Sequence, residues 1–120
     1  MGGGVAGKKE YITSPGDYRL VYNQGSSWTC VLLVMKAMPN SSAVSRCGLS
    51  VSKKVGNAVN RNRVKRLLRE IWRSTPVISG WDIVLIARPA ASTAGYADMK
   101  KAVEGLLRRA DILVTTSVVV

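Results

Sequence analysis

Histidine and phenylalanine are absent from the 120 residues, and cysteine occurs only twice, at Cys30 and Cys47. A tetrahedral zinc site built from cysteine and histidine is therefore excluded, because such a site needs a full set of these ligands. Two cysteines do not make a disulfide framework either. We expect both thiols to be small buried apolar residues on neighbouring strands, in a reducing compartment.

Acidic residues are also scarce, with 7 Asp and Glu against 18 Lys and Arg, which gives a formal charge of +11. A field of this sign and strength favours a polyanionic partner, either nucleic acid or an anionic membrane. The acids are scattered over different predicted elements, and no histidine is present to act as a general acid or base. We therefore expect no catalytic residue on this chain and no metal held tightly by it.

Long apolar runs are missing as well. No stretch approaches the ~20 residues that a membrane helix needs, and residues 1–9 lack the apolar core of a signal peptide. We expect a cytoplasmic protein with one domain over residues 10–112. A flexible tail is expected at 1–9, and the apolar C-terminal tail at 113–120 has no assignment.

The rest of the chain predicts helices alternating with strands. Ser14 and Pro15 begin a short helix that Gly25 ends. Ser92 or Thr93 is expected to cap a last helix that carries Tyr96 on its buried side. Strands are predicted over 28–36, 45–52 and 81–87. This order is typical of an α+β fold, a small sandwich of helices packed on a sheet.

Positive charge is concentrated in residues 53–73, where a basic linker over 53–62 precedes an amphipathic helix. The basic residues of this segment, opposed only by Glu70, are Lys53, Lys54, Arg61, Arg63, Lys65, Arg66, Arg69 and Arg73. The apolar residues that recur at helical spacing are Val64, Leu67, Leu68, Ile71 and Trp72. One face of the helix is therefore expected to be buried.

The opposite face of this helix is expected to present Asn62, Arg66, Arg69 and Arg73, flanked by Arg63 and Lys65. On an ordinary solvated helix, opposite charges pair at i, i+4, whereas like charges crowd each other here. Guanidinium groups match phosphate oxygens with two hydrogen bonds at once. The row therefore predicts contact with nucleic acid. A DNA recognition helix and a membrane-surface helix remain less favoured alternatives.

The run from Gly48 to Glu70 resembles the signature of the bacterial ribonuclease P protein family. Its core is the triplet Arg61-Asn62-Arg63, which follows the segment Ser50-Val51-Ser52-Lys53-Lys54. Asp17 to Tyr22 resembles the first helix of the family, and Ile86 to Ala90 resembles the end of its last central strand. The resemblance covers roughly residues 10–112.

This resemblance implies a four-stranded sheet with helices, like the second domain of ribosomal protein S5. It also implies that the unit spanning residues 45–87 crosses over left-handed, against a rule that about 98% of such connections obey. Only three strands are predicted from the residue pattern. The fourth is therefore expected between Trp28 and Ser45, as a split hairpin.

The resemblance further implies a monomeric protein subunit of an endoribonuclease, whose RNA subunit cleaves precursor tRNA and carries Mg²⁺. Contacts with that RNA are implied at Lys53, Lys54, Arg61, Asn62, Arg63, Lys65, Arg66, Arg69 and Arg73. A cleft for the unpaired 5′ leader of precursor tRNA is implied at Tyr18, Tyr22, Arg46 and Ser50, together with residues of the strand over 31–36.

The sequence departs from the family in having no phenylalanine, where family members commonly place it at positions 18, 22 and 47. Tyrosine still stacks on unpaired bases, so Tyr18 and Tyr22 keep this interpretation. Helix packing against the sheet is an equally weighted explanation for both residues. A ribosomal or rRNA-binding structural protein is the alternative function, because its composition and fold would look similar.

Overall fold

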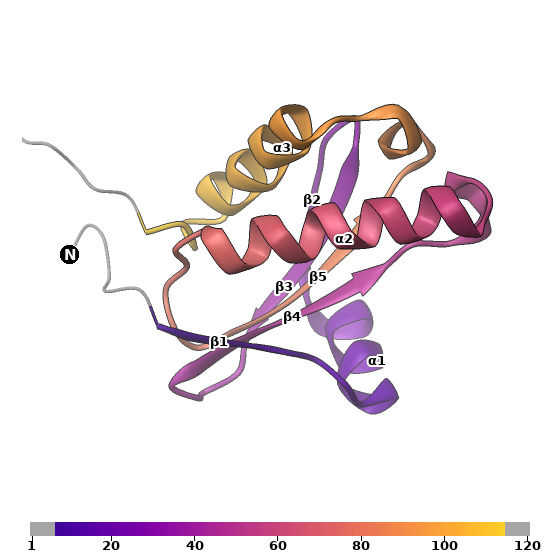
Figure 1. The fold of residues 1–120 in the computed structure, drawn as a ribbon. Helices are drawn as coiled ribbons and strands as arrows, with labels where there is room; N and C mark the ends of the chain where they lie inside the picture. Colours follow the sequence, from indigo (N-terminus) through magenta and orange to yellow (C-terminus); the bar gives the residue numbers. More distant parts are fainter. Residues whose placement is uncertain (1–6, 115–120) are drawn as a thin grey trace, which may run out of the picture.

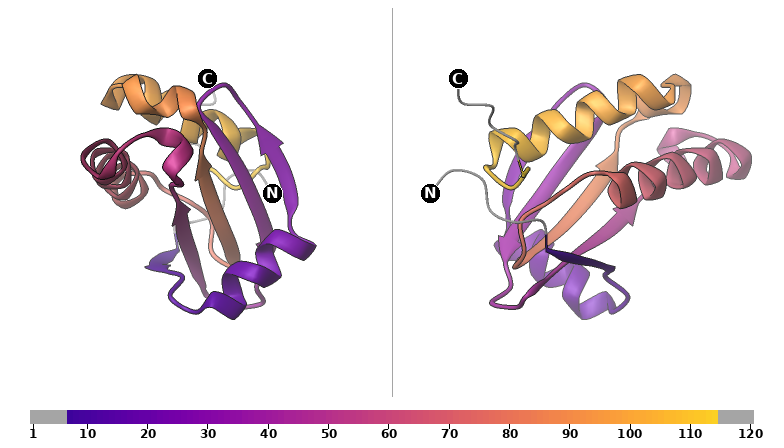
Figure 2. Two further views of the ribbon diagram at one scale, coloured as in Figure 1. Left: turned by 90° about the vertical axis from the view of Figure 1, so that its right-hand side faces the viewer. Right: turned by 60° about the vertical axis from the view of Figure 1, so that its left-hand side comes forward.

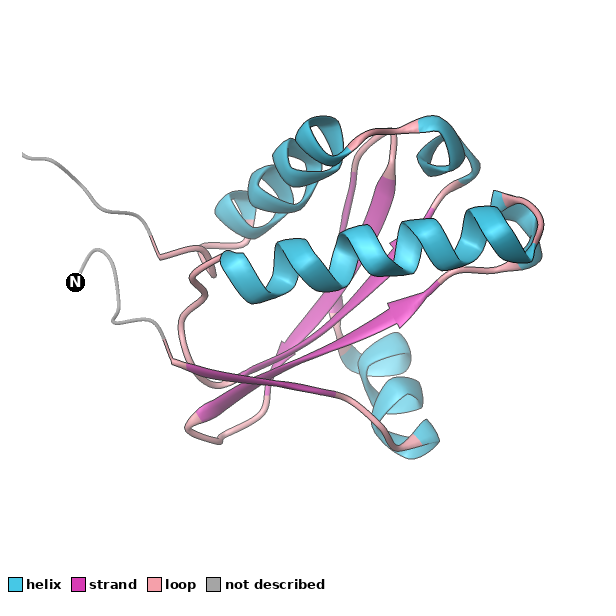
Figure 3. Ribbon diagram, in the orientation of Figure 1, coloured by secondary structure: helices cyan, strands magenta, loops and turns pink. Residues whose placement is uncertain are grey.

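The computed structural model describes residues 7–114 (Figures 1 and 3). The strands are β1 (Lys8–Tyr11), β2 (Ser26–Thr29), β3 (Leu33–Pro39), β4 (Val44–Ser50) and β5 (Trp81–Ala87). The helices are α1 (Pro15–Gln24), α2 (Ala58–Ser74) and α3 (Tyr96–Arg109), with short 3₁₀ turns η1 (Lys53–Val55) and η2 (Pro89–Thr93). No helix among these residues is long and apolar enough to span a bilayer.

The five strands form one mixed sheet in the order β1-β4-β5-β3-β2. The pairs β1–β4 and β4–β5 are parallel, whereas β5–β3 and β3–β2 are antiparallel. Helices α2 and α3 cover one face of the sheet, and α1 packs on the other (Figure 2). The larger core lies under α2 and α3, and a smaller one, including Val21 and Val84, lies under α1.

The connection from β4 through α2 to β5 is the left-handed crossover that the resemblance implied. Seen from the α2 side with both strands pointing upward, β5 lies to the left of β4 (Figure 1). The sheet has five strands where four were expected. The extra strand is β1, which pairs with β4 in the register Lys8↔Val44 to Tyr11↔Cys47.

The single strand predicted over 28–36 is wrong, and the split hairpin expected between Trp28 and Ser45 is confirmed. The chain turns after β2 and returns as β3, with the Cys30 amide donating to the Leu33 carbonyl at 2.9 Å. The turn contains no glycine, proline, asparagine or aspartate, so it carries none of the usual turn residues.

Two helix starts also differ from the prediction. Gly56 has a φ of 144°, and Asn57 then caps α2 by accepting from the Asn60 amide at 3.0 Å. The second half of the predicted basic linker is therefore helical. Helix α3 is preceded by Gly95, whereas Ser92 and Thr93, the predicted caps, lie in η2. Tyr96, predicted on the buried side of this helix, is 38% exposed.

The two cysteines do not lie on neighbouring strands, contrary to the prediction. Cys47 is in β4, whereas Cys30 follows β2, and β5 and β3 separate these two strands in the sheet. Cys47 is buried as expected, and burial raises the pKa of its thiol. Cys30 is only partly buried.

The predicted N-terminal tail contains an ordered structural contact at its end. Lys9 on β1 donates its Nζ to the last carbonyls of α2, at 2.6 Å to Trp72, 2.8 Å to Arg73 and 2.9 Å to Thr75. Carbonyls at the end of a helix lack the usual amide partner four residues on, although the Trp72 carbonyl also accepts from the amide of the C-cap residue Thr75 at 3.4 Å. A cation is favoured at this negative end of the helix dipole. Burial lowers the pKa of Lys9 from its usual value. Residues 1–6 of this tail and 115–120 of the C-terminal tail lie outside the described residues.

Arg46 on β4 links its own strand to β5 and to α1, on the face of the sheet that α1 covers. Its guanidinium donates to Asp82 on β5 at 2.6 and 2.9 Å and to Asp17 on α1 at 3.1 Å. Asn40 donates a further hydrogen bond to Asp82 at 2.8 Å. Burial alone would raise the pKa of Asp82, but the hydrogen bonds from Arg46 and Asn40 outweigh it, so the pKa lies below its usual value.

Replacing Lys9 by methionine should lower the free energy of unfolding by about 1–2 kcal/mol, because three helix-end carbonyls lose a charged donor. Urea denaturation measures this difference. The matched control is Lys8→Met on the same strand, where the side chain is exposed; its effect should stay within about 0.5 kcal/mol. Equal effects of the two substitutions would contradict the capping role.

Acid should weaken the fold through Asp82. Because its folded pKa lies below its unfolded pKa, the stabilisation is complete above the unfolded value, about 3.9, and is lost as the pH falls further. Asp82→Asn should flatten this loss when urea midpoints are compared between about pH 5 and pH 2. The same acid dependence in both proteins would exclude Asp82 as its source.

Candidate nucleic-acid interface

Helix α2 separates an apolar face from a basic one, as predicted. Val64, Leu68, Ile71 and Trp72 are buried against the sheet and α3. The opposite face exposes Asn62, Arg66, Arg69 and Arg73, and Lys65 is partly exposed beside them. The helix is therefore held by its apolar stripe, and its outer face is left to solvent or to a partner.

The charge on this outer face is not neutralised by the protein. Among residues 7–114, both ion pairs involve Arg46, so no carboxylate lies within ion-pair distance of the arginines of α2. Even Glu70, one turn from Arg66 and Arg73, forms no such pair. Like charges at this spacing repel each other, and phosphate groups of a bound polyanion would relieve that repulsion.

The members of the triplet Arg61-Asn62-Arg63 have different environments. Asn62 is exposed, whereas the Nε of Arg61 is buried and has no hydrogen-bond partner within the described part of the chain. Arg63 donates to the carbonyls of Ser92 and Ala94, the latter at 3.0 Å, and so fastens η2 to α2. The structure thus gives Arg63 a structural role that spacing alone did not reveal.

Lys53 and Lys54 lie at the same end of the molecule as the start of α2. Both are exposed in η1, where the Ser52 hydroxyl accepts from the Lys54 amide at 3.3 Å. The turn η1 contacts both η2 and α2, so these lysines lie close to the start of the helix. The positive end of the α2 dipole adds to their field.

A hollow of about 520 Å³ lies between α1 and the end of β4. Tyr18, Tyr22 and Ser50, all predicted for the leader cleft, line it. The other residues that line it are Thr13, Pro15, Arg19 and Leu49. Residues 15, 18, 19 and 22 lie on one stripe at helical spacing, a signal in the sequence that could have identified Arg19.

Tyr18 is held in place by the edge of β4. Strand β1 pairs with β4 only as far as Cys47, so the following residues have no neighbouring strand on that side. The Tyr18 hydroxyl accepts from the Leu49 amide at 3.2 Å, and its ring lies against Gly48. A Cβ at position 48 would meet the ring at 2.4 Å, so only glycine fits beneath this tyrosine.

A second hollow, of about 200 Å³, lies next to the first on the side of α2. Tyr18 and Leu49 line both hollows, which therefore adjoin at the free edge of β4, and the two hollows together are called the groove at β4. The residues that line only the second hollow are Tyr11, Ile12, Cys47, Lys65 and Arg69. Bases and phosphates of one unpaired strand could therefore reach tyrosines and cations together.

Arg46 is the predicted cleft residue that the structure places elsewhere. It lines neither hollow, and its charge is balanced by Asp17 and Asp82. The strand alternation correctly put Arg46 on the same face as Ser50, but alternation does not reveal which polar side chains are already paired. The residues of 31–36 line neither hollow of this groove.

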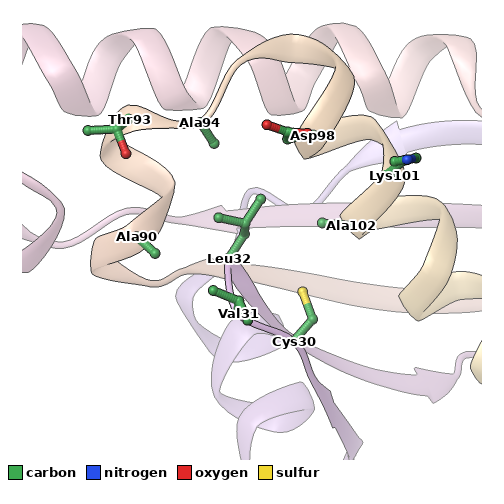
Figure 4. A pocket seen from close by; sticks show the side chains of 9 residues that line it. All are labelled: Cys30, Val31, Leu32, Ala90, Thr93, Ala94, Asp98, Lys101 and Ala102. Carbon is green, nitrogen blue, oxygen red and sulfur yellow. The ribbon is translucent and has the colours of Figure 1, made fainter.

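A separate hollow of about 530 Å³ lies at the β2–β3 turn (Figure 4). Cys30, Val31 and Leu32 face Ala90 and Ala94 across it, and Asp98 and Lys101 line it from the first two turns of α3. Its lining shares no residue with the groove at β4. Among residues 7–114, no three Cys, Asp or Glu side chains gather as metal ligands.

Comparison with known proteins identifies the family. The model of the family Ribonuclease P matches residues 7–111. The ribonuclease P protein component of Dehalococcoides mccartyi is 50% identical over 102 residues, which cover 85% of each chain. That of Clostridioides difficile is 43% identical, over 84% of this chain and 91% of the relative.

Solved structures agree with this assignment. A mutant of the Staphylococcus aureus RNase P protein superposes with a TM-score of 0.78 at 33% identity, over 86% of this chain and 89% of the other. The RNase P protein of Thermotoga maritima gives 0.74 at 30% identity, over 82% and 96%. The fold, the family model and these relatives together show that the chain belongs to the ribonuclease P protein family.

Proposed function

We propose that this chain holds the unpaired 5′ leader of precursor tRNA in the groove at β4 while α2 binds the RNA subunit of ribonuclease P. Membership of the family makes it a protein component of an endoribonuclease that takes part in tRNA processing. In the proposed division of labour, the protein supplies binding and the RNA subunit cuts the leader to leave the mature 5′ end.

The observation that carries the proposal is the row of unneutralised cations on α2. Arg66, Arg69 and Arg73 are exposed on a helix whose other face is buried, and no acid within the described residues pairs with them. Neutralising phosphates with such side chains releases counterions and supplies most of the affinity for a nucleic acid. Lys53 and Lys54 extend this surface at the start of the helix.

The groove at β4 supports the proposal that the chain binds the leader. Unpaired bases stack on aromatic rings with little dependence on sequence, and each stacked base is worth ~1–3 kcal/mol. Tyr22 is 36% exposed, and Tyr18 is held beside it by the edge of β4. A groove of this kind suits leaders of different sequence, and Arg19 at its rim can bind their phosphates.

Bond cleavage is assigned to the RNA subunit. The chain has no histidine. Asp17 and Asp82, which the fold does bring together, share Arg46 between them. We propose that Mg²⁺ is carried by RNA, that the protein is a monomer in the assembled enzyme, and that it works in the cytoplasm.

The proposal is tested by 5′-end cleavage of a precursor tRNA at low Mg²⁺ concentration. Three reactions contain the protein alone, a bacterial ribonuclease P RNA alone, and both together. Efficient cleavage is expected only in the mixture, because the cations of the protein replace part of the Mg²⁺ that RNA folding and docking need. If the protein binds RNA and never stimulates cleavage, the rRNA-binding alternative takes its place.

Removing two arginines from the outer face of α2 should weaken binding to the RNA subunit. For Arg66→Ala with Arg73→Ala, the slope of log affinity against log salt concentration should become shallower by about 1–2, because two phosphate contacts are lost. Filter binding at several salt concentrations measures this slope. Arg108→Ala, which removes an exposed cation from the last turn of α3, is the control and should leave the slope unchanged. An unchanged slope in the double variant would remove α2 from the interface.

A further inference from the structure

Tyr11 is an exposed aromatic residue with no evident structural task. It ends β1 and is 40% exposed, and it belongs to neither apolar core. No side-chain hydrogen bond of its hydroxyl occurs within the described part of the chain. An exposed tyrosine at the rim of a hollow is available to a ligand.

The fold turns Tyr11 toward the cations of α2. Successive side chains of a strand point to opposite faces, so Tyr11 shares the face of Lys9, whose Nζ reaches the end of α2. Tyr11 lines the smaller hollow together with Lys65 and Arg69. These two cations lie four residues apart on α2 and are therefore neighbours on its surface.

Tyr18 borders this hollow from the other side. It lines both hollows at the free β4 edge, so the hollow at Tyr22 adjoins the hollow at Tyr11. The groove thus has an aromatic residue at each end, and Lys65 and Arg69 flank the end at Tyr11. An aromatic ring beside two neighbouring cations suits one nucleotide, because the base stacks on the ring and the phosphate binds the cations.

We propose that Tyr11 is a base-stacking residue that holds one unpaired nucleotide of the RNA substrate between β1 and α2. This inference rests on the proposed leader-binding function and extends it to a residue outside the α1–β4 hollow. The phosphate of that nucleotide lies on Lys65 and Arg69. The N-terminal strand then serves binding as well as closing one edge of the sheet.

The test measures the affinity of the full-length protein, assembled with a bacterial ribonuclease P RNA, for three labelled RNAs. These are mature tRNA and precursors with a short and a long leader. Tyr11→Ala should weaken binding of the long-leader precursor about tenfold, or ~1.4 kcal/mol, and leave mature tRNA unchanged. Tyr11→Phe keeps the ring and should bind like the wild type.

Two controls separate stacking from folding and from charge. Tyr96→Ala removes a tyrosine that is 38% exposed on α3, away from the groove, and should bind all three RNAs like the wild type. The salt dependence of binding should be the same for Tyr11→Ala and the wild type, because the substitution removes no charge. The thermal midpoint of Tyr11→Ala should match that of Tyr96→Ala.

The outcomes distinguish this inference from the function on which it rests. Wild-type affinity of Tyr11→Ala for the long-leader precursor, alongside a selective loss in Tyr22→Ala, would overturn the role of Tyr11 alone. Equal weakening of mature and precursor RNAs in Tyr11→Ala would overturn it too, in favour of a structural role. If the assembled wild-type protein binds mature and precursor tRNA equally, leader binding itself is wrong.

Discussion

The packing of α2 on the sheet is the constraint on which the other features depend. Val64, Leu68, Ile71 and Trp72 are buried, and a rotation of the helix would expose them and bury arginines instead. The basic face is therefore directed outward by the apolar one. Lys9 holds the far end of the helix through three carbonyls, and Arg63 holds η2 against its first turns. Contacts at both ends thus fix the position of the helix that carries the cations.

The edge of β4 organises the other half of the site. Strand β1 leaves this edge at Cys47, and Tyr18 from α1 takes over the Leu49 amide that a longer strand would have bound. Gly48 makes room for the ring. A groove results because this edge is left uncovered over a few residues and one aromatic side chain binds the Leu49 amide there. The same departure of β1 leaves Tyr11 at the rim, facing α2.

The basic residues fall into two groups that composition cannot separate. Arg46 and Arg63 are bound to carboxylates or carbonyls and hold elements together, and Arg88 and Arg109 donate to carbonyls at the β2–β3 turn. By contrast, Arg66, Arg69 and Arg73 are exposed without an ion pair in the described part of the chain. The formal charge of +11 does not show this difference, whereas the structure shows that the outer face of α2 carries a row of arginines not used to hold elements together.

The amphipathic pattern of α2, the short helix after Pro15, the strand over 81–87 and the basic surface follow from the sequence alone, because periodicity and charge are local properties. The family signature added the left-handed crossover, which no local pattern encodes. The signature also implied a fourth strand, as a split hairpin, whereas only the tertiary structure decided that β1 exists, that Arg46 is paired and that Tyr11 lies beside Lys65 and Arg69. Each of these depends on contacts between residues far apart in the chain, such as Lys9 with Trp72 and Arg46 with Asp82. The sequence does not show which lysine or arginine makes such a contact and which remains exposed, because the partner is brought close only by folding.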